Sequence, residues 1–158
     1  MKNRFLLFAT IITFGLTSCK SDACKEVTCL NGGICESGDC VCTTGFEGAN
    51  CATEQRQAFV GIYSATETCN LGDFSYDITI TADSENKTEI TLKNLGDFDF
   101  DITGVVNGTS ISFTDQTGNG STINGSGELN NGTLTIEYDL VTTGGQTLTC
   151  SLTGLIQE

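Results

Sequence analysis

Hydrophobic and polar residues alternate with a period of two through most of residues 57–158, as in β-strands that bury one face. The clearest runs of this kind lie at 74–80, 134–140 and 148–152. Between the runs stand pairs typical of two-residue hairpin turns, namely Asn107-Gly108, Asn131-Gly132 and Gly144-Gly145. We therefore expect eight strands, near 59–67, 74–82, 88–94, 98–106, 109–114, 120–128, 132–140 and 146–156.

Consecutive hairpins build an antiparallel meander, and eight strands can close into a small barrel that has no free edges. Cys69 and Cys150 fall at the end of the first expected strand and within the last, so a disulfide between them would hold these strands together. In the chain-entropy model, closing a loop of that length is worth about 4.5 kcal/mol. The expected fold class is mainly β, with an eight-stranded antiparallel barrel favoured over a β-sandwich. The size of the domain and the Gly61-x-Tyr63 start resemble lipocalin-like barrels.

The alternation also predicts which side chains face inward. A buried set is expected at Phe74, Tyr76, Phe98, Phe100, Leu134, Ile136 and Leu148. Asp97, Asp99 and Asp101 would then lie together on the exposed face of one strand. One ten-residue motif occurs twice, as Asn-Leu-Gly-Asp-Phe-x-Tyr-Asp-Ile-Thr at 70–79 and with Phe in place of Tyr at 94–103. We expect the two copies to form the same loop-to-strand structure in successive hairpins.

The N-terminal segment has the features of an export signal. Lys2 and Arg4 precede an apolar run from Phe5 to Leu16, which is too short to span a bilayer as a helix. The run ends in Leu-Thr-Ser-Cys at 16–19, which resembles a bacterial lipobox. That resemblance implies a signal peptide at 1–18, lipidation of Cys19, and a short tether at 19–23. It further implies a lipid-anchored protein of the bacterial cell envelope, resembling Bacteroidetes lipoproteins, in the periplasm or exposed at the surface of the outer membrane.

Six cysteines crowd into residues 24–51, a segment too short to bury a sufficient apolar core without cross-links. Spacing alone allows 15 pairings of six cysteines. Asn31-Gly32-Gly33 before the third cysteine and the closing segment 42–51, with its glycines and Phe46, resemble an EGF-like domain. The resemblance implies the disulfides Cys24–Cys35, Cys29–Cys40 and Cys42–Cys51. Residues 52–56 are polar and are expected to form a linker to the β-domain at 57–158.

Charge and composition exclude several function classes. The chain carries a net charge of −13, and loss of residues 1–18 would leave 5 basic and 20 acidic residues, a net charge of −15. Such a chain repels nucleic acid. Because it contains no histidine, catalytic triads and dyads that need one are excluded, and zinc hydrolysis is disfavoured.

Acidic residues offer only weak candidates for calcium. In the cysteine-rich segment, Asp22 alone stands where calcium-binding EGF-like domains place a ligand. On one face of a strand, Asp97, Asp99 and Asp101 would be spaced by roughly 7 Å, too far apart to share one ion without loop ligands. We expect neither a metal nor a cofactor.

These patterns predict a non-enzymatic, lipid-anchored protein that binds or adheres to a partner through its distal β-domain. The alternative is a lipocalin-like carrier of a small apolar ligand, and a carboxylate-dependent hydrolase is a third candidate. The partner is a protein, a glycan or a small apolar molecule. An open interior cavity would favour the carrier, whereas a filled barrel with an exposed apolar patch would favour a protein partner.

Overall fold

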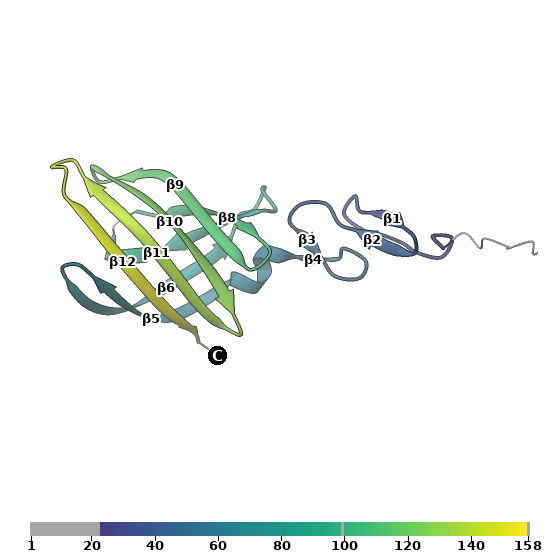
Figure 1. Ribbon diagram of the computed structural model, residues 1–158, viewed down its shortest axis with the longest axis horizontal. Helices are drawn as coiled ribbons and strands as arrows, with labels where there is room; N and C mark the ends of the chain where they lie inside the picture. Colours follow the sequence, from purple (N-terminus) through teal and green to yellow (C-terminus); the bar gives the residue numbers. More distant parts are fainter. Residues whose placement is uncertain (1–22, 99, 158) are drawn as a thin grey trace, which may run out of the picture.

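A computed structural model describes residues 23–98 and 100–157. The protein is mainly β, as predicted, with a small disulfide-rich module at 24–51 followed by a closed barrel. The cysteine-rich module projects from one end of the barrel (Figure 1). The predicted signal peptide at 1–18, the lipidation site Cys19, and two calcium candidates, Asp22 and Asp99, lie outside the described residues.

Disulfides take the place of a core in the cysteine-rich module. Its strands are two short pairs, β1 (Ile34–Glu36) with β2 (Asp39–Val41) and β3 (Phe46–Glu47) with β4 (Thr53–Glu54). Its disulfides join Cys24 to Cys35, Cys29 to Cys40 and Cys42 to Cys51, the pairs that the EGF-like resemblance implies. Within residues 23–54, only Gly45 and Cys51 are buried.

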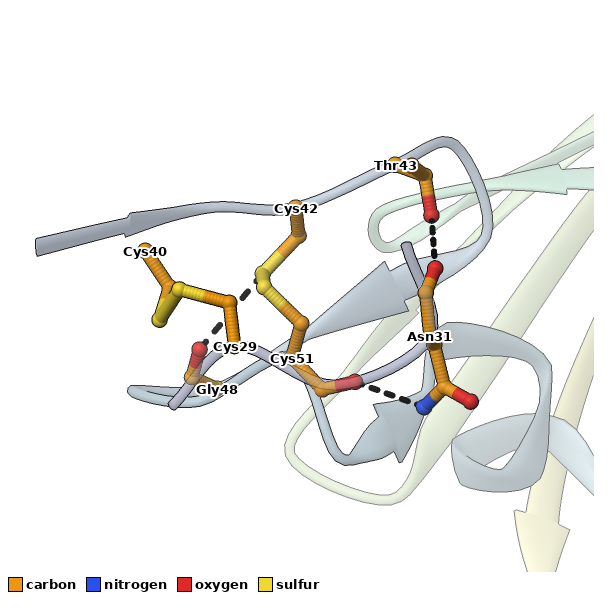
Figure 2. The surroundings of a disulfide bond; sticks show 7 residues. All are labelled: Cys29, Asn31, Cys40, Cys42, Thr43, Gly48 and Cys51. Carbon is orange, nitrogen blue, oxygen red and sulfur yellow. Dashed lines mark hydrogen bonds between the residues drawn. A yellow bond between two sulfur atoms is a disulfide. The ribbon is translucent and has the colours of Figure 1, made fainter. Parts of the chain in front are cut away.

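Two side chains tie the turns of this module to each other (Figure 2). The Asn31 amide donates from Nδ2 to the Cys51 carbonyl at 2.8 Å, and the Thr43 hydroxyl donates to the Asn31 carbonyl, also at 2.8 Å. Asn31 itself adopts a positive φ of 50°, which asparagine tolerates better than most residues. The module is thereby held by covalent and polar links in place of apolar packing.

The C-terminal domain is a closed barrel of eight antiparallel strands. They are β5 (Gly61–Cys69), β6 (Gly72–Ala82), β7 (Glu89–Lys93), β8 (Ile102–Asn107), β9 (Ser110–Gly118), β10 (Ser121–Asn130), β11 (Thr133–Thr142) and β12 (Thr147–Ile156). Each strand pairs with the next in the chain, and β12 closes the barrel by pairing with β5. Cys69 and Cys150 stand opposite each other in that closing pair and form the fourth disulfide, with Cα atoms 4.1 Å apart. The barrel is therefore confirmed, and the sandwich alternative is wrong.

Alternating inward residues fill the half of the barrel nearest the cysteine-rich module. Tyr63, Ile78 and Ile90 are almost completely buried there, and they belong to one continuous core. The short 3₁₀ helix η1 (Gln55–Phe59) inserts Phe59 at this end, and the Tyr63 hydroxyl donates to the Phe59 carbonyl at 2.9 Å. The first strand consequently begins at Gly61, two residues later than predicted.

Several inward assignments need correction. Leu134 and Ile136 are buried as predicted, whereas Tyr76, Phe98, Phe100 and Leu148 are only partly buried against the core. Phe74 is 49% exposed. It faces the same side as Glu67, its register partner on β5, but stands near the open end of the barrel. Phe74 therefore faces inward as predicted, but its predicted burial is wrong, because it lines an open cavity at that end.

The predicted strand 98–106 begins only at Ile102. Asn94 and Gly96 adopt left-handed conformations, with φ of 63° and 67°, and these turn the chain into a second 3₁₀ helix, η2 (Leu95–Asp97). Asp97 and Asp101 are exposed as predicted, but they do not share a strand face.

The polar segment predicted as a linker is structured and attaches the module to the barrel. The buried Arg56 guanidinium donates to the Glu54 carboxylate at 2.8 Å, and also to the carbonyls of Asp83, Asn86 and Glu89 in and beside the β6–β7 loop. The hydrogen bond from Arg56, followed by that from Lys87, holds the pKa of Glu54 below its ordinary value. Gly45 packs against the same loop, where a Cβ would come within 2.9 Å of Thr88 Cγ2.

Candidate functional site

A cavity of about 410 Å³ opens at the end of the barrel away from the cysteine-rich module. We call it the distal cavity. It lies where β5, β6, β11 and β12 reach the turns at the far end in Figure 1, and η2 from the β7–β8 connection borders it. Its lining residues are Glu67, Cys69, Phe74, Ser75, Tyr76, Gly96, Asp97, Phe98, Tyr138 and Leu148.

The polar part of the distal cavity is centred on Glu67, which is only 4% exposed. Tyr63, Ala65 and Glu67 alternate along β5 and face inward, which places the carboxylate just above the filled core. The Tyr138 hydroxyl donates to Glu67 Oε1 at 2.6 Å. The Tyr76 hydroxyl accepts a hydrogen bond from the Gly96 amide at 2.8 Å, which joins β6 to the η2 loop.

Both tyrosines remain proton donors over the physiological pH range. Burial, together with hydrogen bonding to Glu67, raises the pKa of Tyr138 well above its ordinary value. The same two causes, in the same order, raise the pKa of Tyr76. Since each hydroxyl stays neutral, the hydrogen bond from Tyr138 gives Glu67 no compensating positive charge.

The rest of the lining is largely apolar. The Phe98 ring packs edge-on against Tyr138 with ring centroids 6.1 Å apart, and it stacks on Phe100 at 6.0 Å. Leu148 and the Cys69–Cys150 disulfide complete the wall. Gly96 leaves room for this arrangement, because a Cβ there would lie 2.3 Å from the Phe98 ring and 2.7 Å from the Tyr138 hydroxyl.

No cluster in the described part of the chain has the ligands of a metal site. Glu67, Cys69 and Cys150 bring one ligand atom each within 4.8 Å of one another, but both sulfurs belong to the disulfide and offer no thiolate. Of the calcium candidates, Asp97 lines the mouth of the cavity, and Asp101 lies 4.0 Å from Lys93 in an exposed ion pair.

Glu67 is the functional residue that sequence reasoning missed. The sequence did indicate that Glu67 faces inward, because it follows Tyr63 and Ala65 in the same two-residue alternation along β5. An acidic residue at the end of an inward series is also found where a strand emerges into solvent. The pattern therefore does not reveal that the carboxylate is buried beside an open cavity.

A wider groove of about 760 Å³ runs over β10, β11 and β12 on the outside of the barrel. Its floor carries outward-facing residues such as Ser126, Glu137 and Thr149, all of them exposed. We regard the distal cavity as the candidate site, because it alone of these two combines enclosure with a buried polar group.

Comparison with known proteins adds no assignment: no family model matches the chain, and neither does any curated protein. None of the helices within 23–98 and 100–157 is long and apolar enough to cross a membrane.

Proposed function

We propose that the protein binds a small, mainly apolar ligand in the distal cavity and acts as a carrier or receptor for it. The observation that supports this function is the cavity itself, whose volume of about 410 Å³ falls in the range of small-molecule sites, roughly 300–1,000 Å³. Its aromatic and aliphatic walls with few buried polar groups fit the usual composition of such sites. The function is one of binding, with no chemical change to the ligand.

The cavity supports the carrier over adhesion to a protein partner. A barrel used only as an adhesion surface needs no internal space, and its inward positions would be filled from end to end. Here the core leaves a cavity at the end away from the cysteine-rich module, where Phe74 remains 49% exposed. The open barrel end is also compatible with the lipocalin-like resemblance of the domain.

Cell-envelope attachment is the second part of the proposal. Lipidation of Cys19 would fix the N-terminus at a membrane, and the EGF-like module would separate the barrel from the lipid surface. The residues that line the distal cavity belong to the barrel end that carries the β5–β6 and β11–β12 turns, and Figure 1 shows that end pointing away from the module, so a ligand in the aqueous phase could enter without crossing the anchor.

Titration with N-phenyl-1-naphthylamine, a neutral apolar probe whose emission rises in apolar surroundings, tests the binding function. The full chain should bind it saturably. Leu148→Trp replaces an aliphatic side chain of the cavity wall with a bulky indole ring, and it should weaken binding by about tenfold or more. Thr149→Trp is the matched control, because Thr149 is the exposed neighbour on the same strand.

Equal loss in both variants, or emission that rises without saturation, would contradict the proposal. If Leu148→Trp fails to fold, as judged by circular dichroism, amide NMR shifts in the unmodified chain replace it. Probe binding should then move the Gly96 and Leu148 amide signals more than that of Glu137, which faces outward. Shifts confined to other parts of the protein would argue against the distal cavity.

A further inference from the structure

The charge of Glu67 is not compensated by any cation in the described structure. Arg56 and Glu67 are the buried charged residues of the described chain, and Arg56 lies at the opposite end of the barrel, beside Glu54. The ion pairs found between described residues join Arg56 and Lys87 to Glu54, and Lys93 to Asp101. Glu67 takes part in none of them.

An isolated carboxylate is costly to bury. After relaxation, removing one from water still costs several kcal/mol, and hydrogen bonds from neutral donors offset only part of that. The Tyr138 hydroxyl, 2.6 Å from Oε1, supplies such a bond. A positive charge beside Glu67 would supply the missing compensation, and the open cavity leaves room for one to enter with a ligand.

The remainder of the cavity also favours a cation over an anion. Its other charged residue is Asp97, and its lining contains neither lysine nor arginine. The rings of Tyr76, Phe98 and Tyr138 present aromatic surfaces that attract cations. The net charge of −13 on the whole chain would further concentrate positively charged ligands and repel anionic ones such as fatty acids.

We propose that the ligand of the distal cavity is a cationic amine on an apolar body. Its ammonium group pairs with the Glu67 carboxylate, and its apolar part lies against Phe98, Leu148 and the Cys69–Cys150 disulfide. This inference rests on the proposed binding function and specifies the chemical class of its ligand. Glu67 is then the residue that determines specificity, with Tyr138 fixing the orientation of its carboxylate.

Three probes that differ only in the head group test this specificity: 4-phenylbutylamine, 4-phenylbutan-1-ol and 4-phenylbutanoate. Calorimetric titration of the full chain should rank the amine first, about tenfold or more tighter than the alcohol, as expected for a charge-assisted hydrogen bond. The carboxylate should bind most weakly. Comparable affinities for amine and alcohol, or tighter binding of the carboxylate, would overturn the inference.

Glu67→Gln removes the charge while keeping an oxygen that can accept from Tyr138, so the fold should be retained. It should lower amine affinity by about tenfold or more, to the level of the alcohol, and leave the affinity for the alcohol unchanged. Glu137→Gln is the matched control, since it makes the same charge change on the outer face of β11 and should alter neither affinity. A similar loss in both variants would mean that the charge of the whole protein, and not Glu67, governs binding.

The ranking of the three probes in the unmodified chain tests the inference even if Glu67→Gln does not fold. Failure of the specificity and failure of the binding function are also distinguishable. If N-phenyl-1-naphthylamine binds but the amine shows no advantage, the cationic ligand class is wrong and the carrier stands. If neither that probe nor any of the three phenylbutyl compounds binds, the carrier function is itself wrong.

Discussion

Residues 70–79 and 94–103 are identical at eight of ten positions, yet they form different structures. The first copy makes a tight hairpin, because Cys69 pairs with Gly72 and the strand continues without interruption to Ala82. The second copy turns at Asn94, forms η2, and enters a strand only at Ile102. Leu71 is accordingly 72% exposed at a hairpin tip, whereas its equivalent Leu95 is completely buried.

The surroundings of each copy account for the difference. The first follows directly on β5, and its Asn70 is fastened to β12 by hydrogen bonds to the carbonyls of Thr147 and Thr149. The second follows the short strand β7, whose register with β8 pairs Leu92 with Ile102 and leaves the intervening residues outside the ladder. That loop borders the distal cavity and buries Leu95 completely in the barrel core. A local sequence thus favours two conformations, and the barrel end selects one of them.

Truncating the two leucines should expose the contrast most strongly. Leu95→Ala should lower the free energy of unfolding by about 2–5 kcal/mol, because it leaves a void at a fully buried site. Leu71→Ala removes an exposed side chain and should stay within about 0.5 kcal/mol of the unmodified protein. Urea unfolding followed by circular dichroism measures both, and equal losses would mean that Leu71 is buried in solution.

The glycines of the two copies should respond less strongly, and again unequally. Gly96→Ala should cost about 1–3 kcal/mol, since the new methyl group would overlap the Phe98 ring and the Tyr138 hydroxyl. Gly72→Ala also meets a positive φ, of 141°, but has no atom nearer than 4.0 Å, so about 1 kcal/mol is expected. Only Gly96→Ala should also weaken binding of N-phenyl-1-naphthylamine, because Phe98 must move; an unaffected affinity would argue that Phe98 does not shape the cavity.

Tyr76 provides a chemical difference between the copies, since its equivalent is Phe100. Tyr76→Phe removes the acceptor for the Gly96 amide and a hydroxyl that interacts with Glu67, which should cost about 1 kcal/mol. Phe100→Leu reduces packing at the equivalent position but keeps that network, and it serves as the comparison for packing alone. Loss of protection of the Gly96 amide against hydrogen exchange should accompany Tyr76→Phe only.

The same tyrosine should contribute to the alkaline limit of stability. Burial raises the pKa of all three tyrosines above the ordinary value of 10.0. Well below pH 10 each is protonated in the folded and the unfolded chain, so none adds a pH dependence there. Above pH 10 the unfolded chain loses protons that the folded chain keeps, and stability falls as pH rises. Tyr76→Phe should make that fall less steep, and an unchanged slope would mean that Tyr76 ionises normally in the folded protein.

The smallest effects are expected at the aspartates of the two copies. Asp77→Asn and Asp101→Asn should each change stability by no more than about 0.5 kcal/mol, because both side chains are exposed and their polar contacts face solvent. Calcium at millimolar concentration should leave the melting temperature of the protein unchanged. A rise that disappears in an Asp97→Asn, Asp101→Asn double variant would instead identify a calcium site in the second copy.

The period-two alternation determined the mainly β fold class and, for most strands, which side chains face inward, and the positions of Cys69 and Cys150 favoured the closing strand pair over a sandwich. Which side chains of a strand face inward is a local property, because successive side chains of a strand must point to opposite faces. Whether an inward position is buried depends on how the side chains of eight strands fill the common interior, which no single strand encodes. Only the tertiary structure therefore decided that Phe74 stays exposed, that Leu95 is buried while its equivalent Leu71 is exposed, and that Glu67 lies buried beside an open cavity.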